Sequence, residues 1–218
     1  MVPPFPFVTA LTQLSPFFRA DFVGRLPGHR GDTDKEAALA PLRSMHERAA
    51  QALGFSKIYH AGQPHGRKVA VATPDGPSSF PDADALISIS PGVCLGIHVA
   101  DCGPLYLVDA KTGALGLIHS GRKGTEKNIT GETVTALQKH FGSQPEDLHA
   151  FLGPCLRPPH YEVNFAAQII RQAEAAGIPK AQVHDSGLCT SDLSRFYSYR
   201  LEKGRTGRLL ALLGRVDK

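Results

Sequence analysis

The chain has 218 residues, a length that suits one domain or two closely packed halves that share a core. Hydrophobic residues make up 42% of it and charged residues 20%, which excludes a disordered chain. The net charge is only +4, with lysine and arginine spread along the sequence, so a dedicated nucleic-acid-binding protein is not expected.

The N-terminal segment is rich in proline, phenylalanine and glycine. Residues 1–18 carry four prolines and no basic leading region, which argues against a signal peptide. Short strands are predicted at 9–14 and 20–24. The basic turn that follows contains Arg25, which is either a solvated loop residue or part of a functional site.

A helical pattern runs from Asp32 to Leu53 and stops at Gly54, with Pro41 either dividing the helix or marking its beginning. Two strands are predicted next, at 57–60 and 68–73, around a turn that exposes His65. Taken alone, a turn histidine is more often solvated surface than a ligand.

The most informative stretch spans residues 82–124, where apolar runs stop at Cys102 and His119. Between them, 105–108 and 114–118 read as two strands joined by a polar turn. A hairpin returns its second strand beside its first, so the thiol and the imidazole are expected to be neighbours. They could be soft ligands for zinc, a nucleophile with its base, or an ordinary buried cysteine and a strand-end histidine.

A glycine-rich turn with two cations, Arg122 and Lys123, precedes a helix predicted at 125–141 and interrupted by Gly131. Unpaired N–H groups and the helix dipole would reinforce these charges, which predicts an anion site; an ordinary glycine loop is the alternative. A strand at 148–152, a helix at 165–176 and a final pair of strands at 194–201 and 207–216 complete the chain.

The four cysteines are widely spaced and follow no disulfide framework, so reduced thiols and a cytoplasmic location are expected. No apolar run approaches the roughly 20 residues that a membrane helix needs. No linker is long or polar enough to separate domains, and no solenoid repeat is present.

Several ordered motifs make the chain resemble the laccase-domain family, also called polyphenol oxidoreductase or YfiH-like, whose better-studied members are described as purine nucleoside phosphorylases. The resemblance covers nearly the whole chain. Its motifs are Gln63 to Gly66 for Q-V-H-G, 82–102 for A-D-A-L-V-T…P-G…A-D-C, His119 to Gly124 for H-A-G-W-R-G, 153–155 and 161–163 for G-P-C…Y-E-V, 189–190 for C-T, and 196–200 with 204–207 for F-Y-S-Y-R…G-x-T-G.

The resemblance implies an α+β fold, with mixed β-sheets packed between helical layers in a single compact domain over residues 1–218. It also implies that His65, Cys102 and His119 hold a zinc ion, so the turn histidine becomes a third ligand. Three ligands leave a fourth position open, as in catalytic zinc sites. A multicopper centre is not expected, because it needs many clustered histidines and the ten here are scattered along the sequence.

The resemblance further implies phosphorolysis of purine nucleosides, with adenosine deamination at the same metal as a second activity, and hence purine nucleoside and phosphate as partners. Cys102, His119 and Lys123 would be catalytic, and Arg25, Arg122 and Lys123 would position phosphate. The family's Trp-Arg pair reads Arg122-Lys123 here, and its Cys-Cys before Tyr-Glu-Val reads Pro159-His160. Lysine keeps a cation but loses the bidentate fork of arginine.

Two rival hypotheses remain beside this one. Cys102 and His119 could act as nucleophile and base of a cysteine hydrolase or deamidase. Alternatively, a divergent member could keep zinc for folding and serve as a non-catalytic binding module.

Overall fold

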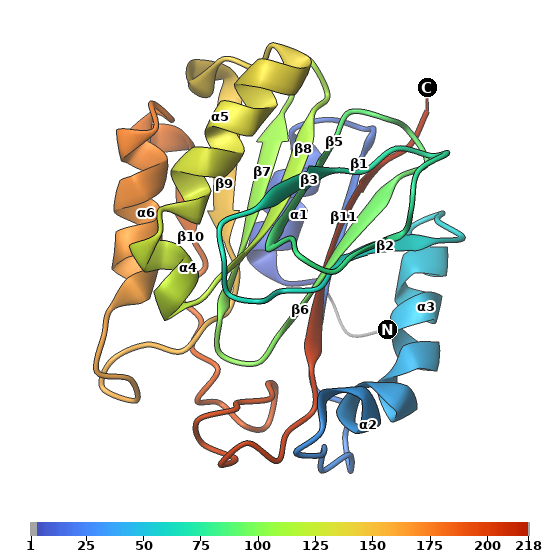
Figure 1. Cartoon of the computed structure of the whole chain (residues 1–218), viewed down its shortest axis with the longest axis vertical. Helices are drawn as coiled ribbons and strands as arrows, with labels where there is room; N and C mark the ends of the chain where they lie inside the picture. Colours follow the sequence, from blue (N-terminus) through green and yellow to red (C-terminus); the bar gives the residue numbers. More distant parts are fainter. Residues whose placement is uncertain (1–3, 218) are drawn as a thin grey trace.

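Two mixed β-sheets face each other in the computed structural model, which describes residues 4–217 (Figure 1). The first sheet has five strands, which in spatial order are β1 (Phe18–Val23), β11 (Leu209–Arg215), β6 (Cys94–Val99), β2 (Ile58–Ala61) and β4 (Ser79–Phe80). β11 pairs antiparallel with both β1 and β6, whereas β2 pairs parallel with both β6 and β4.

The second sheet has six strands and contains the predicted hairpin. In spatial order they are β10 (Val183–Asp185), β9 (Leu148–Leu152), β7 (Gly103–Asp109), β8 (Leu115–Ser120), β5 (Ala85–Ser88) and β3 (Val69–Val71). β7 and β8 pair antiparallel in a register that places Pro104 opposite His119. The hairpin prediction is therefore confirmed.

Three hydrophobic clusters hold the layers together, and alternation along the strands decides which cluster each side chain joins. On β11, Leu209, Ala211 and Leu213 face the cluster between the sheets, which also includes residues of helix α1 (Pro6–Gln13). Leu210 and Leu212 point the other way, toward helix α3 (Arg43–Ala52).

On the far side of the second sheet, a third cluster joins the strands to helices α5 (Ile129–Phe141) and α6 (Phe165–Ala175). Figure 1 shows these two helices on one side of the molecule and α3 on the other. The fold is thus α+β with two mixed sheets between helical layers, as expected. No helix in residues 4–217 has the length and apolarity to cross a membrane.

Some expected elements differ from the observed ones. Residues 9–13 of the strand predicted at 9–14 belong to helix α1, because Pro6 is at its first turn and Phe7, Val8 and Leu11 form one buried face. The helical segment from Asp32 is divided at Pro41, into helix α2 (Lys35–Leu39), a 3₁₀ turn (Ala40–Leu42) and α3.

The helix expected at 125–141 is also divided, but not at Gly131. It forms helix α4 (Arg122–Glu126) and α5, with the break at Lys127 and Asn128. Asn128 adopts a left-handed backbone (φ 57°) and its side chain caps α5 by accepting a hydrogen bond from the Gly131 N–H.

The strand predicted at 194–201 was wrong, since these residues form turns and β11 pairs with β1 and β6 instead. The alternating sequence does not correspond to two strand faces, because the consecutive residues Phe196 and Tyr197 are both buried in the core between the sheets, whereas Tyr199 is 56% exposed. Short 3₁₀ turns at Pro145–Asp147 and Lys180–Gln182 lead into β9 and β10.

Candidate metal centre

His65, Cys102 and His119 come together where the two sheets meet. Their ligand atoms all lie within 4.8 Å of one another, and Cys102 Sγ is 4.0 Å from His65 Nε2. Cys102 immediately precedes β7 and His119 lies in β8, so the hairpin brings the thiol and one imidazole together as the sequence predicts. His65 arrives from the turn after β2, which belongs to the other sheet.

The turn that carries His65 is fixed by hydrogen bonds from the Gln63 side chain to strand β6. Gln63 and His65 both have a left-handed backbone, with φ of 66° and 63°. The Gln63 side chain accepts a hydrogen bond from the His98 N–H (3.0 Å) and donates one to the His98 carbonyl (2.5 Å). These contacts to β6 stabilise a backbone conformation that is costly for residues with a side chain.

Asp84 connects two of the three candidate ligands. Its carboxylate is fully buried and accepts hydrogen bonds from the backbone N–H groups of His65 (2.9 Å) and Gly66 (2.6 Å). It also lies 2.9 Å from His119 Nδ1. A carboxylate at Nδ1 places the proton there and leaves Nε2 available as a ligand, the usual arrangement around metal-binding histidines.

The electrostatics of the trio favour a thiolate. Burial alone would raise the pKa of Cys102, but the charges and hydrogen bonds of His119 and His65 outweigh burial and lower it to about 6. Burial would likewise lower the pKa of His119, whereas the Cys102 thiolate and the Asp84 carboxylate raise it to about 9. A thiolate is the form in which cysteine binds metal or attacks an electrophile.

The three residues fit a zinc ion by the chemistry of their donors. Two imidazole nitrogens and one thiolate are typical zinc ligands, and three protein ligands leave a coordination position for a substrate or water. At Gly121 a Cβ atom would collide with Cys102 Sγ, so only glycine leaves the thiol room in its present position. Within residues 4–217, this is the group of His, Cys, Asp and Glu side chains whose spacing suits a metal.

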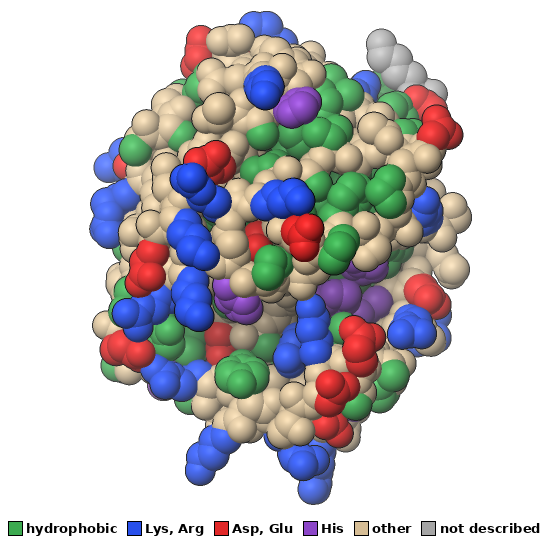
Figure 2. All heavy atoms as spheres, viewed as in Figure 1, with side chains coloured by type: hydrophobic (Ala, Val, Ile, Leu, Met, Phe, Trp, Pro, Cys, Tyr) green, Lys and Arg blue, Asp and Glu red, His purple; other side chains and the backbone are tan. Residues whose placement is uncertain are grey.

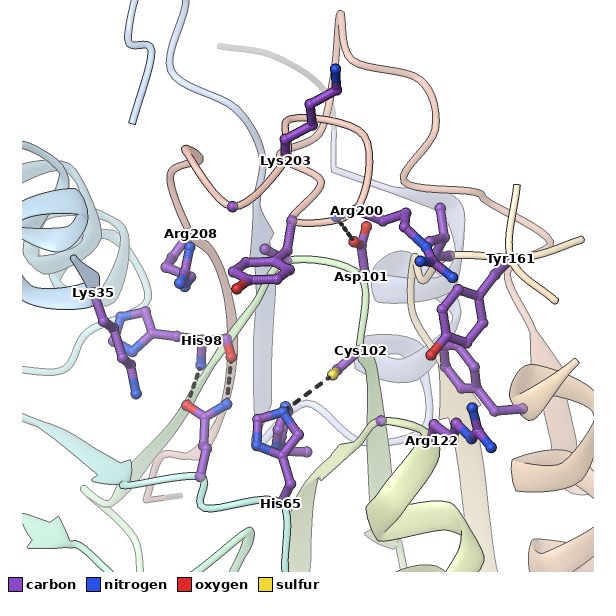
Figure 3. Close-up of a pocket in the computed structure, with 18 of the residues that line it drawn as sticks. Lys35, His65, His98, Asp101, Cys102, Arg122, Tyr161, Arg200, Lys203 and Arg208 are labelled. Carbon is purple, nitrogen blue, oxygen red and sulfur yellow. Dashed lines mark hydrogen bonds between the residues drawn. The ribbon is translucent and has the colours of Figure 1, made fainter. Parts of the chain in front are cut away.

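The trio lines a cavity of about 770 Å³, large enough for a nucleoside together with a small anion. Figure 3 shows Cys102 and His65 near its centre, with Lys35, His98 and Arg208 to one side and Arg122, Tyr161 and Arg200 to the other. On the molecular surface, basic and histidine side chains gather around the lower centre of the face in Figure 2.

The structure brings one of the three expected phosphate-binding cations to this cavity. Arg122 lines it and forms an ion pair with Glu126 at 2.9 Å. Lys123, the next residue of α4, is exposed and does not line the cavity, because consecutive helical residues point in different directions. Arg25 does not line it either, since its guanidinium pairs with Glu202 at 2.8 Å and lies 4.8 Å from the centre of the Tyr197 ring.

Two further basic residues of the lining, Lys35 and Arg208, are not among the residues predicted for this site from the sequence, and Asp101 lines the cavity beside Cys102. Asp101 has a left-handed backbone (φ 92°) immediately before Cys102. Its carboxylate accepts hydrogen bonds from Thr190 Oγ1 and from the Arg200 N–H, each at 2.7 Å. A non-glycine residue in this conformation beside a candidate ligand is the kind of strain found at functional sites.

Three histidines stack beside the cavity: His46 of α3, His60 of β2 and His98 of β6. The His98 ring centre lies 4.9 Å from that of His60 and 5.3 Å from that of His46. Burial lowers the pKa of His46 and of His60 to about 4, and it holds the pKa of His98 well below its usual value. All three are therefore neutral in the folded protein near pH 7.

We expect this stack to make the fold sensitive to acid. The unfolded chain takes up protons on these histidines below its pKa of about 6.5, while the folded chain cannot until about pH 4. Stability is therefore complete above pH 6.5 and falls between these values, by up to ~1.4 kcal/mol per pH unit for each histidine. Urea unfolding at pH 7.5 and pH 5 should show a smaller pH effect in His46→Phe than in the parent protein. The exposed His140→Gln should match the parent, and equal pH effects in all three proteins would contradict the prediction.

The chain matches a known family model and is similar in sequence to several known proteins. A family model described as multi-copper polyphenol oxidoreductase laccase matches residues 28–168 and 164–215. A purine nucleoside phosphorylase of Deinococcus radiodurans is 35% identical over 202 residues, which cover 80% of this chain and 77% of that protein. A purine nucleoside phosphorylase of Xylella fastidiosa strain 9a5c is 30% identical over 235 residues, covering 92% and 86% of the two chains.

Among solved structures, YlmD from Geobacillus stearothermophilus superimposes with a TM-score of 0.79. The alignment covers 99% of this chain and 94% of that one at 23% sequence identity. At this identity the likeness shows a shared fold.

Proposed function

Because this chain belongs to the multi-copper polyphenol oxidoreductase laccase family, whose curated relatives include proteins named purine nucleoside phosphorylase, we propose that it is a metal-dependent purine nucleoside phosphorylase. One observation carries the proposal: a His-Cys-His donor set lies in a cavity that also holds basic and aromatic side chains. A closed structural zinc site would need a fourth protein ligand.

The reaction joins phosphate to the ribose. A phosphate oxygen forms a bond to C1′ while the bond from C1′ to the purine nitrogen breaks and its electron pair leaves with the base. The proton that the phosphate carried ends on the base, so the products are ribose 1-phosphate and the free purine. Cations that hold the phosphate against C1′ would lower the barrier by positioning and by stabilising charge.

The cavity offers one end suited to the purine. Tyr161 and Phe165 pack edge to face there, with ring centres 5.7 Å apart, and the Arg200 guanidinium lies 4.9 Å from the Tyr161 ring centre. Aromatic and guanidinium planes can stack on a flat heterocycle. We assign this end to the base, which leaves the ribose near the centre of the cavity.

We propose zinc as the metal, held by His65, Cys102 and His119. When bound, zinc would supply a Lewis acid beside the substrate. His119 would be kept in its ligand orientation by Asp84, and His65 by the hydrogen-bonded turn described above. A multicopper centre would need further clustered ligands, and within residues 4–217 these three side chains are the group with metal-binding spacing.

Two other activities fit the same donors. Adenosine deamination is a second candidate, because a zinc site with an open position is also the arrangement used by nucleobase deaminases. A cysteine hydrolase is a third, because Cys102 and His119 lie together as a nucleophile and base would. A non-catalytic zinc-binding module is the remaining alternative.

Incubating the zinc-loaded protein with inosine or adenosine, with and without phosphate, separates these possibilities. Phosphorolysis predicts free hypoxanthine or adenine and ribose 1-phosphate, formed only when phosphate is present and lost after chelation. Inosine formed from adenosine without phosphate would indicate deamination. Turnover that resists chelators but stops when Cys102 is alkylated would indicate the cysteine hydrolase, and no turnover at all would leave the binding module.

A further inference from the structure

Five basic side chains line the cavity, and three of them are already engaged or point away. Arg122 pairs with Glu126, and Arg200 pairs with Glu162. Lys203 is exposed, and its side chain extends out of the cavity in Figure 3. The remaining two, Lys35 and Arg208, lie near His98 on the side of the cavity opposite Arg122 (Figure 3), close enough for their charges to interact.

Lys35 and Arg208 are half-buried, and no carboxylate of residues 4–217 forms an ion pair with either of them. Lys35 Nζ donates to the Gly62 carbonyl at 3.2 Å. Arg208 uses Nη1 for the carbonyls of Thr206 (3.3 Å) and Gly207 (2.9 Å), which leaves its other N–H groups available. Both side chains therefore have donors to offer a ligand.

The surroundings only partly offset these two charges. Burial lowers the pKa of Lys35, and the charge of Arg208 lowers it further. Burial also lowers the pKa of Arg208. The charges of Glu36 and Asp84 raise the pKa of Lys35 without outweighing burial, and Asp84 is already bonded to His119 and the His65 turn. The charges of Tyr199, Cys102 and Asp101 act in the same direction on the pKa of Arg208, again without outweighing burial. Two half-buried cations that lack an ion-pair partner are costly unless an anion joins them.

We propose that Lys35 and Arg208 form a binding site for a phosphoryl dianion beside the candidate metal centre. The paired charges match a dianion, and the planar guanidinium suits the oxygens of a phosphoryl group. The ligand is either inorganic phosphate or the 5′-phosphate of a nucleotide. The inference deepens the proposed phosphorolysis by placing phosphate opposite the aromatic end, with the ribose between them.

The direct test is calorimetric titration of inorganic phosphate into the zinc-loaded and the metal-free protein. Lys35→Met and Arg208→Met should each raise the phosphate Kd by about tenfold or more, the effect of losing one charge-assisted contact. Arg208→Lys should show a smaller loss, because it keeps the charge. Lys139→Met, an exposed lysine on α5, is the matched control and should bind phosphate as the parent does. Circular dichroism and melting curves identify any variant that fails to fold. If either Lys35→Met or Arg208→Met fails to fold, the phosphate Kd of the other variant tests the proposal.

Steady-state kinetics distinguishes the two sources of the dianion. If the site holds inorganic phosphate, Lys35→Met raises the phosphate KM about tenfold and changes the nucleoside KM by less than about twofold. If it holds a substrate ester, the parent protein prefers nucleoside 5′-phosphates, and Lys35→Met removes that preference.

Unchanged phosphate binding and unchanged KM values in Lys35→Met and Arg208→Met would overturn the inference while phosphorolysis stands. A larger effect of Arg122→Met on the phosphate KM would also overturn it, because phosphate would then occupy the other end of the cavity. If the parent protein shows no phosphorolysis, the proposed function fails, but the calorimetric comparison still decides whether this anion site exists.

Discussion

Cys102→Ala is expected to abolish zinc binding and turnover while the fold survives. The substitution removes one of three proposed ligands, and the side chain is only partly buried at the edge of the core between the sheets. Removing an outer-shell partner of a metal typically costs 10- to 100-fold in affinity, so loss of a direct ligand should cost more than about 100-fold. His119→Ala should have the same effect on zinc, with an added loss of stability because the buried Asp84 carboxylate loses one of its three hydrogen-bond partners.

Metal content measured by mass spectrometry after dialysis checks this prediction, alongside phosphorolysis assays and circular dichroism. Cys189→Ala is the matched control, because Cys189 is also partly buried but does not line the cavity. It should keep about one zinc per chain, as expected of a single three-ligand site. A Cys102→Ala protein that retains stoichiometric zinc or parental turnover would refute the metal role.

Asp84→Ala is expected to weaken both the fold and the metal centre, although Asp84 is not itself a proposed ligand. The substitution leaves the N–H groups of His65 and Gly66 and the His119 ring without their acceptor. Each buried donor without a partner costs ~1–3 kcal/mol, so the free energy of unfolding should fall by about 3 kcal/mol or more. Zinc affinity should fall about 10- to 100-fold, because both histidines lose their orientation.

Urea unfolding and competitive zinc titration measure these two effects separately. Asp82→Ala provides the control two residues earlier, since the Asp82 side chain is 77% exposed and its ion pair with Lys68 is long, at 3.5 Å. Its stability should stay within about 0.5 kcal/mol of the parent. Asp84→Asn should retain more zinc affinity than Asp84→Ala, because the amide oxygen can still accept. Equal zinc affinity in Asp84→Ala and the parent would disprove the positioning role.

The sequence was most informative for the hairpin, because its pattern of apolar runs and a polar turn also fixes which strands are neighbours. Two apolar runs joined by a polar turn predict the β7 and β8 hairpin, and the hairpin alone brings Cys102 to His119. The turns at 194–201 were predicted as a strand because aromatic and polar residues alternate there. Tertiary packing overrides that pattern, since Phe196 and Tyr197 are consecutive and both fully buried.

The candidate site was less predictable because its parts come from distant segments. Asp84 and His119 are 35 residues apart, and Lys35 and Arg208 meet only after both sheets have formed. No local pattern marks a carboxylate that accepts three hydrogen bonds or a lysine that lacks an acidic partner. The resemblance to a family supplied His65, which a turn histidine alone would not have indicated.

The third proposed ligand approaches from a different sheet than the first two. Cys102 and His119 flank one hairpin, whereas the turn of His65 follows β2 in the opposite layer. An ion bound by all three would cross-link the two layers, in addition to their apolar contacts and the hydrogen bonds that Asp84 accepts from the His65 turn. The isolated hairpin offers two donors, so tight capture of the ion must wait until the layers have docked. Tight metal binding would therefore occur only in chains whose two sheets have already packed together.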